Sequence, residues 1–461
     1  MNAFTPPAQA RSRWLRPKAG FIHLALLGSL VGLVGCVPYQ SLPLDPQETA
    51  GNFGGRTLDD PSLKRFMTEQ KSGRGAWGVD RLAVAAAFFQ GEVAVARAEA
   101  AAAAAGIETA GQSPNPVLSF APGYNTSSSG ISPWMIAPAL EVTLETAGKK
   151  DLRLAAARAQ AEAAHLRVAA AAWVVRTKVR AAMLDLHAAQ ENAALLGAEI
   201  ALHEAAITHL QLLVNAGESP GFELTQERLG LSRTKLAHHD AEKMAAVSRA
   251  QLAAVIGVPG AAVAAVTLDF SDFTALAAVP GPGLRRRALT HRADLLAMLA
   301  DYAAAEAELR LEVAKQYPDV HFSPGYEFDQ DDNKWSLGIG VELPVFHQNR
   351  GPIAEALAKR NTVGAKFEAG QQAVFGQIEI ALAGYQAATA KAATAKALAE
   401  QAALATAATE QLVKLGELAP LELTRRRIEA SAARLSQFEA TIQAQQTAGE
   451  LEAAVQVPLA K

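Results

Sequence analysis

The chain has 461 residues, of which half are hydrophobic but only 6% aromatic, and its formal net charge is -3. The nearly balanced charge excludes the basic field that steers proteins to nucleic acid. Much of the apolar content is alanine, which favours helix more than any other residue. The only cysteine is Cys36, so no intramolecular disulfide can form. After residue 35 no apolar run approaches the ~18 residues that a transmembrane helix requires.

Residues 1–35 have the pattern of a secretory signal peptide. A basic segment, residues 11–18, precedes an apolar stretch, residues 21–34. The following Leu-Val-Gly-Cys at 33–36 is typical of a lipobox, so we expect Cys36 to be lipidated and to become the first mature residue. The alternative is an ordinary signal peptide followed by a chance cysteine. By analogy with bacterial lipoprotein sorting, proline at position 38 favours the outer membrane.

The lipidated N-terminal segment, residues 36–78, is rich in glycine, proline and charge, with one helix expected near residues 61–70. The rest of the chain is duplicated, with equivalent positions about 200 residues apart. Asn-Pro-Val-Leu-Ser-Phe-Ala-Pro-Gly-Tyr at 115–124 matches Tyr-Pro-Asp-Val-His-Phe-Ser-Pro-Gly-Tyr at 317–326. Glu-Leu-Thr at 223–225 recurs at 422–424. We assign repeat 1 to residues 79–260, a linker to 261–287 and repeat 2 to 288–461.

Each repeat is expected to contain a helix, two strands, a very long helix and a final helix. In repeat 1 these span residues 80–111, 117–124, 134–144, 149–214 and 221–256. In repeat 2 they span residues 289–315, 318–328, 335–345, 352–414 and 420–455. At a rise of 1.5 Å per residue each long helix would reach roughly 100 Å. Such a helix requires neighbouring helices along its length.

The four strands alternate apolar residues with small or polar ones, which is the period-two pattern of a two-faced sheet. In the last strand, for example, Trp335, Leu337 and Ile339 alternate with Ser336 and Gly338. Strands of ~9–11 residues suit an outer-membrane barrel with a lipid-facing outside and a polar lumen. The residues that we expect to face the lumen are Glu141, Thr143, Asp319, His321, Glu327 and Glu342. The alternative is a soluble sheet packed on helices, but the lipobox and the long helices favour the membrane.

Four strands cannot close a barrel alone, because known single barrels start at about eight and an open edge in lipid leaves backbone groups unpaired. The chain must therefore oligomerise. Three copies would supply twelve strands and two copies eight, and the spacing alone does not choose between them.

Several short motifs resemble those of a known family. They are Glu-Thr-Ala-Gly-Lys-Lys at 145–150, Leu-Pro-Val-Phe at 343–346 and Asn-Arg-Gly at 349–351. Arg-Ala-Asp-Leu at 292–295 differs from the family's Arg-Pro-Asp-Leu by one residue. With the strand, long-helix and turn repeat, these motifs resemble the TolC family of outer-membrane efflux ducts, and more closely its CzcC-like branch, which is linked to heavy-metal pumps. The resemblance covers nearly the whole mature chain.

The resemblance implies a mostly α fold with a small transmembrane β part. Three copies would form a twelve-stranded β-barrel in the outer membrane above a periplasmic α-helical barrel. The duct would be a passive exit rather than an enzyme. Its partners would be outer-membrane lipid, a periplasmic adaptor (membrane fusion) protein and an inner-membrane pump of the resistance-nodulation-division type.

The two turns after the long helices, residues 215–220 and 414–420, would form the lower end of the tunnel. Gly217 and Gly416 permit a tight reversal, and Glu218 and Glu417 beside them are candidates for adaptor docking. The alternative is two ordinary hairpin loops.

The family also closes this lower end, often with acidic rings just above it. Glu410 is the candidate for such a periplasmic gate, and Gln211 is the equivalent residue of repeat 1. Three glutamates facing one another in a narrow lumen would raise one another's pKa and attract cations. The alternative is an ordinary exposed charge on a helix.

No catalytic motif or paired-cysteine metal site is present in the sequence, and we expect no cofactor and no metal site. His238 and His239 are adjacent, so on a helix they point in different directions. The pairs His187–Glu191 and Glu199–His203 have i, i+4 spacing, and we interpret them as solvated helix faces. The resemblance to the CzcC-like branch makes an exit duct for heavy-metal cations the leading hypothesis. A duct for hydrophobic drugs, solvents or secreted polypeptide is the alternative within the fold, and a structural lipoprotein spanning the periplasm is the alternative of another class.

Overall fold

The computed structural model describes residues 38–71, 75–126, 132–281 and 283–459. Cys36 lies outside these residues. The chain divides into two compact units, residues 1–52 and 53–461. The described part of the first unit contains most of α2 (Pro46–Gly54), whose first turn is capped by a hydrogen bond from the Gln47 amide to Asp45 Oδ1 at 2.8 Å.

The second unit holds the two repeats. Repeat 1 and the segment before it contain α3 (Pro61–Glu69), α4 (Val79–Phe89), α5 (Gly91–Gly111), β1 (Val117–Tyr124), β2 (Trp134–Leu144), α6 (Lys149–Asn215) and α7 (Gly221–Ile256). The linker contains α8 (Gly260–Ala264) and the short 3₁₀ helix η1 (Ser271–Phe273). Repeat 2 contains α9 (Leu284–His291), α10 (Ala293–Ala314), β3 (Val320–Asp329), β4 (Asp332–Val341), α11 (Arg350–Lys414) and α12 (Pro420–Val455).

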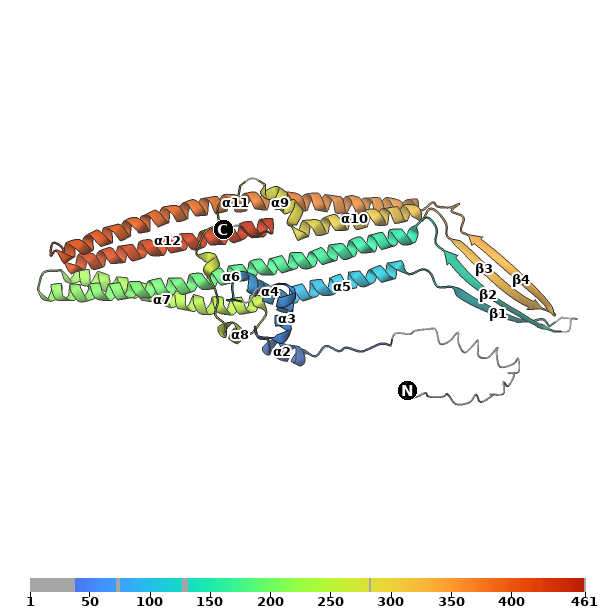
Figure 1. The fold of residues 1–461 in the computed structure, drawn as a ribbon, viewed down its shortest axis with the longest axis horizontal. Helices are drawn as coiled ribbons and strands as arrows, with labels where there is room; N and C mark the ends of the chain where they lie inside the picture. Colours follow the sequence, from blue (N-terminus) through green and yellow to red (C-terminus); the bar gives the residue numbers. More distant parts are fainter. Residues whose placement is uncertain (1–37, 72–74, 127–131, 282, 460–461) are drawn as a thin grey trace, which may run out of the picture. The chain divides into compact units, whose positions relative to one another are not determined.

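The long helices pack as two hairpins joined side by side. Helix α6 pairs with α7, α11 pairs with α12, and α12 also contacts α6, so the order across the unit is α7, α6, α12, α11 (Figure 1). The shorter helices α5 and α10 lie along the strand-proximal half of α6, and α10 also contacts α11. Many contact positions are alanine, such as Ala163, Ala206, Ala440 and Ala444. Small side chains allow the close helix spacing that these interfaces require.

The apolar core lies at the middle of the long helices. Leu82 of α4, Met183 of α6 and Leu252 of α7 are fully buried in one cluster, and a second cluster joins α9, α11 and α12 around Tyr385. The Tyr385 hydroxyl donates a hydrogen bond to the Ala277 carbonyl, which anchors the linker to α11. The strands therefore extend from one end of a stabilised middle section, and the hairpin turns lie at the other end (Figure 1).

The first helix of each repeat is interrupted, whereas the sequence pattern predicts one continuous helix. The helix expected over residues 80–111 breaks at Gln90, and the one expected over 289–315 breaks at Arg292; both residues adopt an extended ψ, 130° and 113°. Each side chain reaches the end of the last helix of its own repeat. Gln90 donates to the Ala254 carbonyl at 2.9 Å and Arg292 to the Ala454 carbonyl at 2.6 Å. These bonds satisfy carbonyls that a helix C-terminus otherwise leaves unpaired.

Strands β1 to β4 form one antiparallel sheet in sequential order. Strand β4 spans residues 332–341 rather than the expected 335–345. At its start, Gln330 and Asp331 both have positive φ, as in the tight hairpin turns that match strand twist, so pairing begins at Asp332. At its end, Val341 pairs with the first residue of β3, and Pro344 cannot donate to a ladder. Asp319 and Glu342 therefore lie just outside the strands.

Candidate functional site

The sheet has one apolar and one polar or small face, and the registers align these faces across all four strands. Val142 lies opposite Phe322, and Phe322 lies opposite Ile339, whereas Thr143 lies opposite His321. The apolar face consists of Leu118, Phe120, Pro122, Tyr124, Trp134, Ile136, Pro138, Leu140, Val142, Leu144, Val320, Phe322, Pro324, Tyr326, Phe328, Trp335, Leu337, Ile339 and Val341. Many of these large side chains are exposed; Trp335 is 82% exposed and Leu337 66%. Such an apolar surface marks an interaction with lipid or protein.

Polar residues expected from the sequence come together on the other face. The Thr143 hydroxyl lies 3.1 Å from Nδ1 of His321, and a Glu141 carboxylate oxygen lies 3.2 Å from the same nitrogen. Glu327 shares this face and lies opposite Lys334. The structure thus assembles a small hydrogen-bonded cluster on the face of the sheet where polar and small residues predominate and only Val117 and Met135 are large and apolar among the paired residues.

Asp319 belongs to the junction between the sheet and the helices. Its Oδ1 accepts hydrogen bonds from the Lys149 ammonium at 2.7 Å and from the Thr146 amide at 2.9 Å. Burial alone would raise the pKa of Asp319, but these two bonds, together with the charge of Lys149 and a smaller effect of His321, outweigh burial and lower that pKa below its usual value. The interaction joins β3 of repeat 2 to the start of α6 of repeat 1, so it fixes how the strands leave the helices.

The two hairpin turns at the opposite end have the same backbone geometry. Gly217 and Gly416 have φ of 78° and 77°. The amides of Glu218 and Glu417 donate to the Leu213 and Leu412 carbonyls at 2.8 and 2.9 Å. The glycine amides donate to the Val214 and Val413 carbonyls at 3.1 and 3.0 Å. This pair of bonds is the Schellman motif, in which a left-handed glycine ends a helix.

The turns present acidic and apolar groups to solvent, and they are held together laterally. Glu218 and Glu417 are exposed, and Leu415 is 72% exposed. Behind the turns, Leu421 of α12 packs into a cluster with Leu210 and Leu224 of the other hairpin. Arg425 of α12 also pairs with Glu223 of α7 at 2.9 Å. The two tips therefore form one surface with a fixed backbone.

Substituting Gly217 by alanine is expected to destabilise its turn by about 1–2 kcal/mol, because an L-residue there must adopt the left-handed conformation. Nothing lies within 4 Å of a Cβ added at Gly217, so the cost is purely conformational. Gly221 is the matched control: a Cβ there also meets nothing, and its φ is not positive. Hydrogen–deuterium exchange should therefore speed up at 217–218 in Gly217→Ala but not in Gly221→Ala. Equal exchange in both variants would contradict this account.

The two gate candidates make equivalent contacts within the chain. Gln211 accepts a hydrogen bond from Arg228 at 3.0 Å, and the carboxylate of Glu410 lies 3.6 Å from the guanidinium of Arg427 and 3.0 Å from the Lys414 ammonium. The hydrogen bond and charge of Lys414, with a smaller effect of Arg427, lower the pKa of Glu410. Within one chain the shift is thus opposite to the one expected for a ring of like charges.

Two histidines interpreted as solvated are instead packed. His203 is buried, and its Nδ1 lies 2.6 Å from a carboxylate oxygen of Glu227. His187 stacks on Phe270 with ring centroids 5.1 Å apart, and burial lowers its pKa. The i, i+4 spacing was visible in the sequence, but the packing partners come from other elements.

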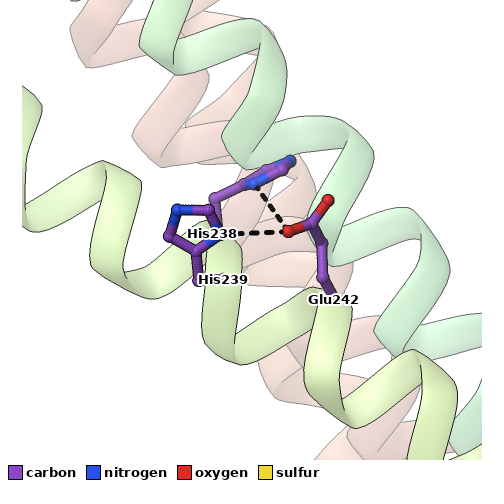
Figure 2. A group of neighbouring side chains, drawn as sticks. All are labelled: His238, His239 and Glu242. Atoms are coloured by element: carbon purple, nitrogen blue, oxygen red, sulfur yellow. Dashed lines mark hydrogen bonds and ion pairs between the residues drawn. The ribbon is translucent and has the colours of Figure 1, made fainter.

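A third group of side chains was only partly recognised, because the sequence interpretation considered His238 and His239 but not Glu242. Figure 2 shows that the rings of His238 and His239 on α7 both approach one carboxylate oxygen of Glu242, with Nδ1 atoms 3.6 and 3.1 Å from Oε2. One ligand atom from each residue lies within 4.8 Å of the other two. The pattern His-His-x-x-Glu on a helix is the feature that could have revealed it.

Within the part of the chain that the structure describes, no helix is both long and apolar enough to cross a membrane. The fold thus defines a class: a duplicated helical hairpin protein that carries a small two-faced sheet at one end. This is the protomer fold of outer-membrane channels. The chain resembles MtrE of Neisseria gonorrhoeae in its open state, with a TM-score of 0.66 at 15% identity over 83% of this chain and 89% of that one. It resembles CusC with a TM-score of 0.65 at 16% identity over 82% and 91%.

Sequence comparison gives a family match over part of the chain. Residues 284–455, which span α9 to α12, match the family of outer membrane efflux proteins. The chain is 27% identical over 224 residues to the cobalt-zinc-cadmium resistance protein CzcC of Cupriavidus metallidurans, covering 47% of this chain and 52% of that protein. The match thus spans about half the length of this relative. The chain is thus similar to outer membrane efflux proteins over repeat 2 and, at lower identity, to CzcC. The matched family and the similar folds are those of outer-membrane channels.

Proposed function

We propose that the protein is a passive exit duct for substrates of a tripartite efflux system, formed by three copies in the outer membrane. The observation that carries this proposal is the sheet, whose apolar face is exposed while its opposite face gathers Glu141, Thr143 and His321. A lipid-facing side and a polar lumen require this division.

Both edges of the sheet support assembly from several chains. Strands β1 and β4 each have a neighbour on one side only. In lipid, unpaired backbone groups cost several kcal/mol each, so the edges must pair with other copies. Three copies would supply twelve strands in one closed barrel, and α7 and α11, which lie at opposite ends of the helix order, would meet between copies.

The substrates that we propose are heavy-metal cations, because the similar protein CzcC is named for cobalt, zinc and cadmium resistance. The test is growth of a deletion strain on zinc, cobalt, cadmium, nickel, copper and silver beside hydrophobic drugs, with wild-type complementation as control. Sensitivity to some metals alone supports the proposal. Sensitivity to drugs alone would support an efflux duct whose substrates are hydrophobic drugs rather than metals. A strain lacking any paralogous ducts excludes substitution by another protein.

The tips are the proposed docking surface for a periplasmic adaptor, which would link the duct to an inner-membrane resistance-nodulation-division pump. Support comes from the repeated geometry: Gly217–Glu218 and Gly416–Glu417 present an exposed carboxylate after an identical helix end. Exposed loops held on a rigid scaffold are common binding sites.

Glu410 and Gln211 are proposed to line the periplasmic gate. Reversing the charge in Glu410→Lys should lower cation selectivity in single-channel recordings, because three carboxylates near a narrow lumen attract cations. Glu355→Lys, an exposed helix position far from the tips, is the control. Unchanged selectivity in Glu410→Lys would remove this residue from the gate.

We also propose that Cys36 carries a lipid anchor in the outer membrane, since the only cysteine follows a Leu-Val-Gly sequence. Cys36→Ser should abolish incorporation of radiolabelled palmitate while the protein is still exported. Equal labelling of Cys36→Ser and wild type would exclude this residue as the attachment site.

A further inference from the structure

The group on α7 formed by His238, His239 and Glu242 lies outside the sheet, the junction, the tips and the gate. Its side chains differ in exposure, with 24% for His238, 75% for His239 and 55% for Glu242. The group is therefore open to solvent on one side and supported on the other.

Helix geometry explains why two adjacent histidines meet one glutamate. Each residue turns the helix by about 100°, so Glu242 points about 40° beyond His238 and about 60° short of His239. The carboxylate thus lies between the directions of the two imidazole rings. Figure 2 shows both rings turned towards it.

Packing against the neighbouring helix orients His238. A Cβ added to Gly197 of α6 would lie 3.5 Å from Nε2 of His238, so this edge of the ring faces α6. Nδ1 of His238 therefore faces Glu242 and lies 3.6 Å from its Oε2. One turn earlier on α7, Lys235 forms an ion pair with Glu204 of α6 at 2.9 Å. The Lys235 ammonium is therefore paired with a carboxylate other than Glu242.

These distances suit a metal ion. Two ligands held ~2.1 Å from an ion in tetrahedral geometry are about 3.4 Å apart, and the two nitrogen–oxygen separations are 3.6 and 3.1 Å. Imidazole nitrogen with one carboxylate oxygen favours zinc, copper, nickel or cobalt over magnesium or calcium, which prefer oxygen ligands.

We propose that Nδ1 of His238, Nδ1 of His239 and one carboxylate oxygen of Glu242 bind a divalent transition-metal ion on α7, with water completing its coordination. The site does not depend on the proposed efflux of metals, because the three ligands bind an ion whatever the duct transports. Since all three ligands come from one helix and two are exposed, the ion can exchange with solvent.

The test uses the full-length protein without a polyhistidine tag, purified in detergent, and copper(II) as the probe. We expect one ion per chain, with two nitrogen ligands in the electron paramagnetic resonance spectrum. His238→Ala or His239→Ala should leave one nitrogen. Each of these variants, and also Glu242→Gln, should weaken copper binding by at least about tenfold. Removing a residue that only supports a metal ligand already weakens binding by about that factor, so removing a ligand should cost at least as much. Magnesium should not compete.

His165→Ala is the matched control, because His165 is an exposed histidine on the long helix α6. It should keep both the nitrogen count and the affinity of the wild type. Circular dichroism of every variant shows whether the helices remain folded. Unchanged nitrogen number and affinity in the His238 and His239 variants would overturn the proposed site. If a variant protein still binds copper normally but its cells lose metal tolerance, that loss reports on the proposed efflux function and not on this site.

Discussion

The Leu337→Arg substitution is expected to block stable assembly in the outer membrane, whereas Ser336→Arg is expected to be tolerated. The two residues are neighbours near the middle of β4, so they lie at the same depth on opposite faces of the sheet. Leu337 belongs to the apolar face and is 66% exposed. An arginine facing lipid near the bilayer midplane costs about 2–4 kcal/mol, and three copies would each carry that cost.

The measurement is the yield of heat-resistant oligomer in the outer-membrane fraction, resolved by electrophoresis without boiling. Ser336 lies opposite Gly325 on the small-residue face, where an arginine would project away from lipid. Comparable oligomer in both variants would show that the apolar face does not contact lipid. Failure of Ser336→Arg alone would reverse the assignment of the two faces.

The period-two pattern predicted the sheet because each strand alternates regularly, as at Trp335, Leu337 and Ile339. The duplication predicted the tips, because two Gly-Glu pairs at equivalent positions indicate the same backbone requirement. The observed φ of 78° and 77° at Gly217 and Gly416 supplies the physical reason. Local patterns of this kind can be recognised from sequence because the residues that determine them are close together in the chain.

Features that depend on distant residues could not be predicted in the same way. The break at Gln90 is stabilised by a carbonyl of residue 254, and the environment of His203 is completed by Glu227 of the next helix. The interpretation of His238 and His239 compared only the directions of these two side chains and did not consider Glu242, which points between them. The strand shift at β4 arose because the polar residues Asp332 and Asn333 do not look like strand formers.

The Arg180→Met substitution is expected to cost about 1.5–3 kcal/mol of stability, because the buried Gln445 oxygens lose their charged donor and Glu452 keeps only Arg176, 3.3 Å away, as a guanidinium partner. Arg180 of α6 donates to the carbonyl and side-chain oxygens of Gln445 at 2.8 and 3.1 Å. Its Nε lies 3.3 Å from Glu452, and both charged side chains are only 10% exposed. Gly449 gives the guanidinium room, since a Cβ there would overlap Nη1. The measurement is the temperature at which helical circular dichroism is lost.

Two further variants test whether the loss of stability in Arg180→Met comes from burial of its ion pair rather than from loss of a charge alone. Lys359→Met removes an exposed pair with Glu355, in which both side chains are 66% exposed, so it should leave the unfolding temperature close to that of the wild type. The double variant Arg180→Met/Glu452→Gln should recover part of the loss, because the remaining buried group is then neutral. If Arg180→Met unfolds at the same temperature as Lys359→Met, the alanine contacts between α6 and α12 hold the two hairpins together without the ion pair. A large loss that the double variant partly reverses would make Arg180 and Glu452 the polar link between the two repeats.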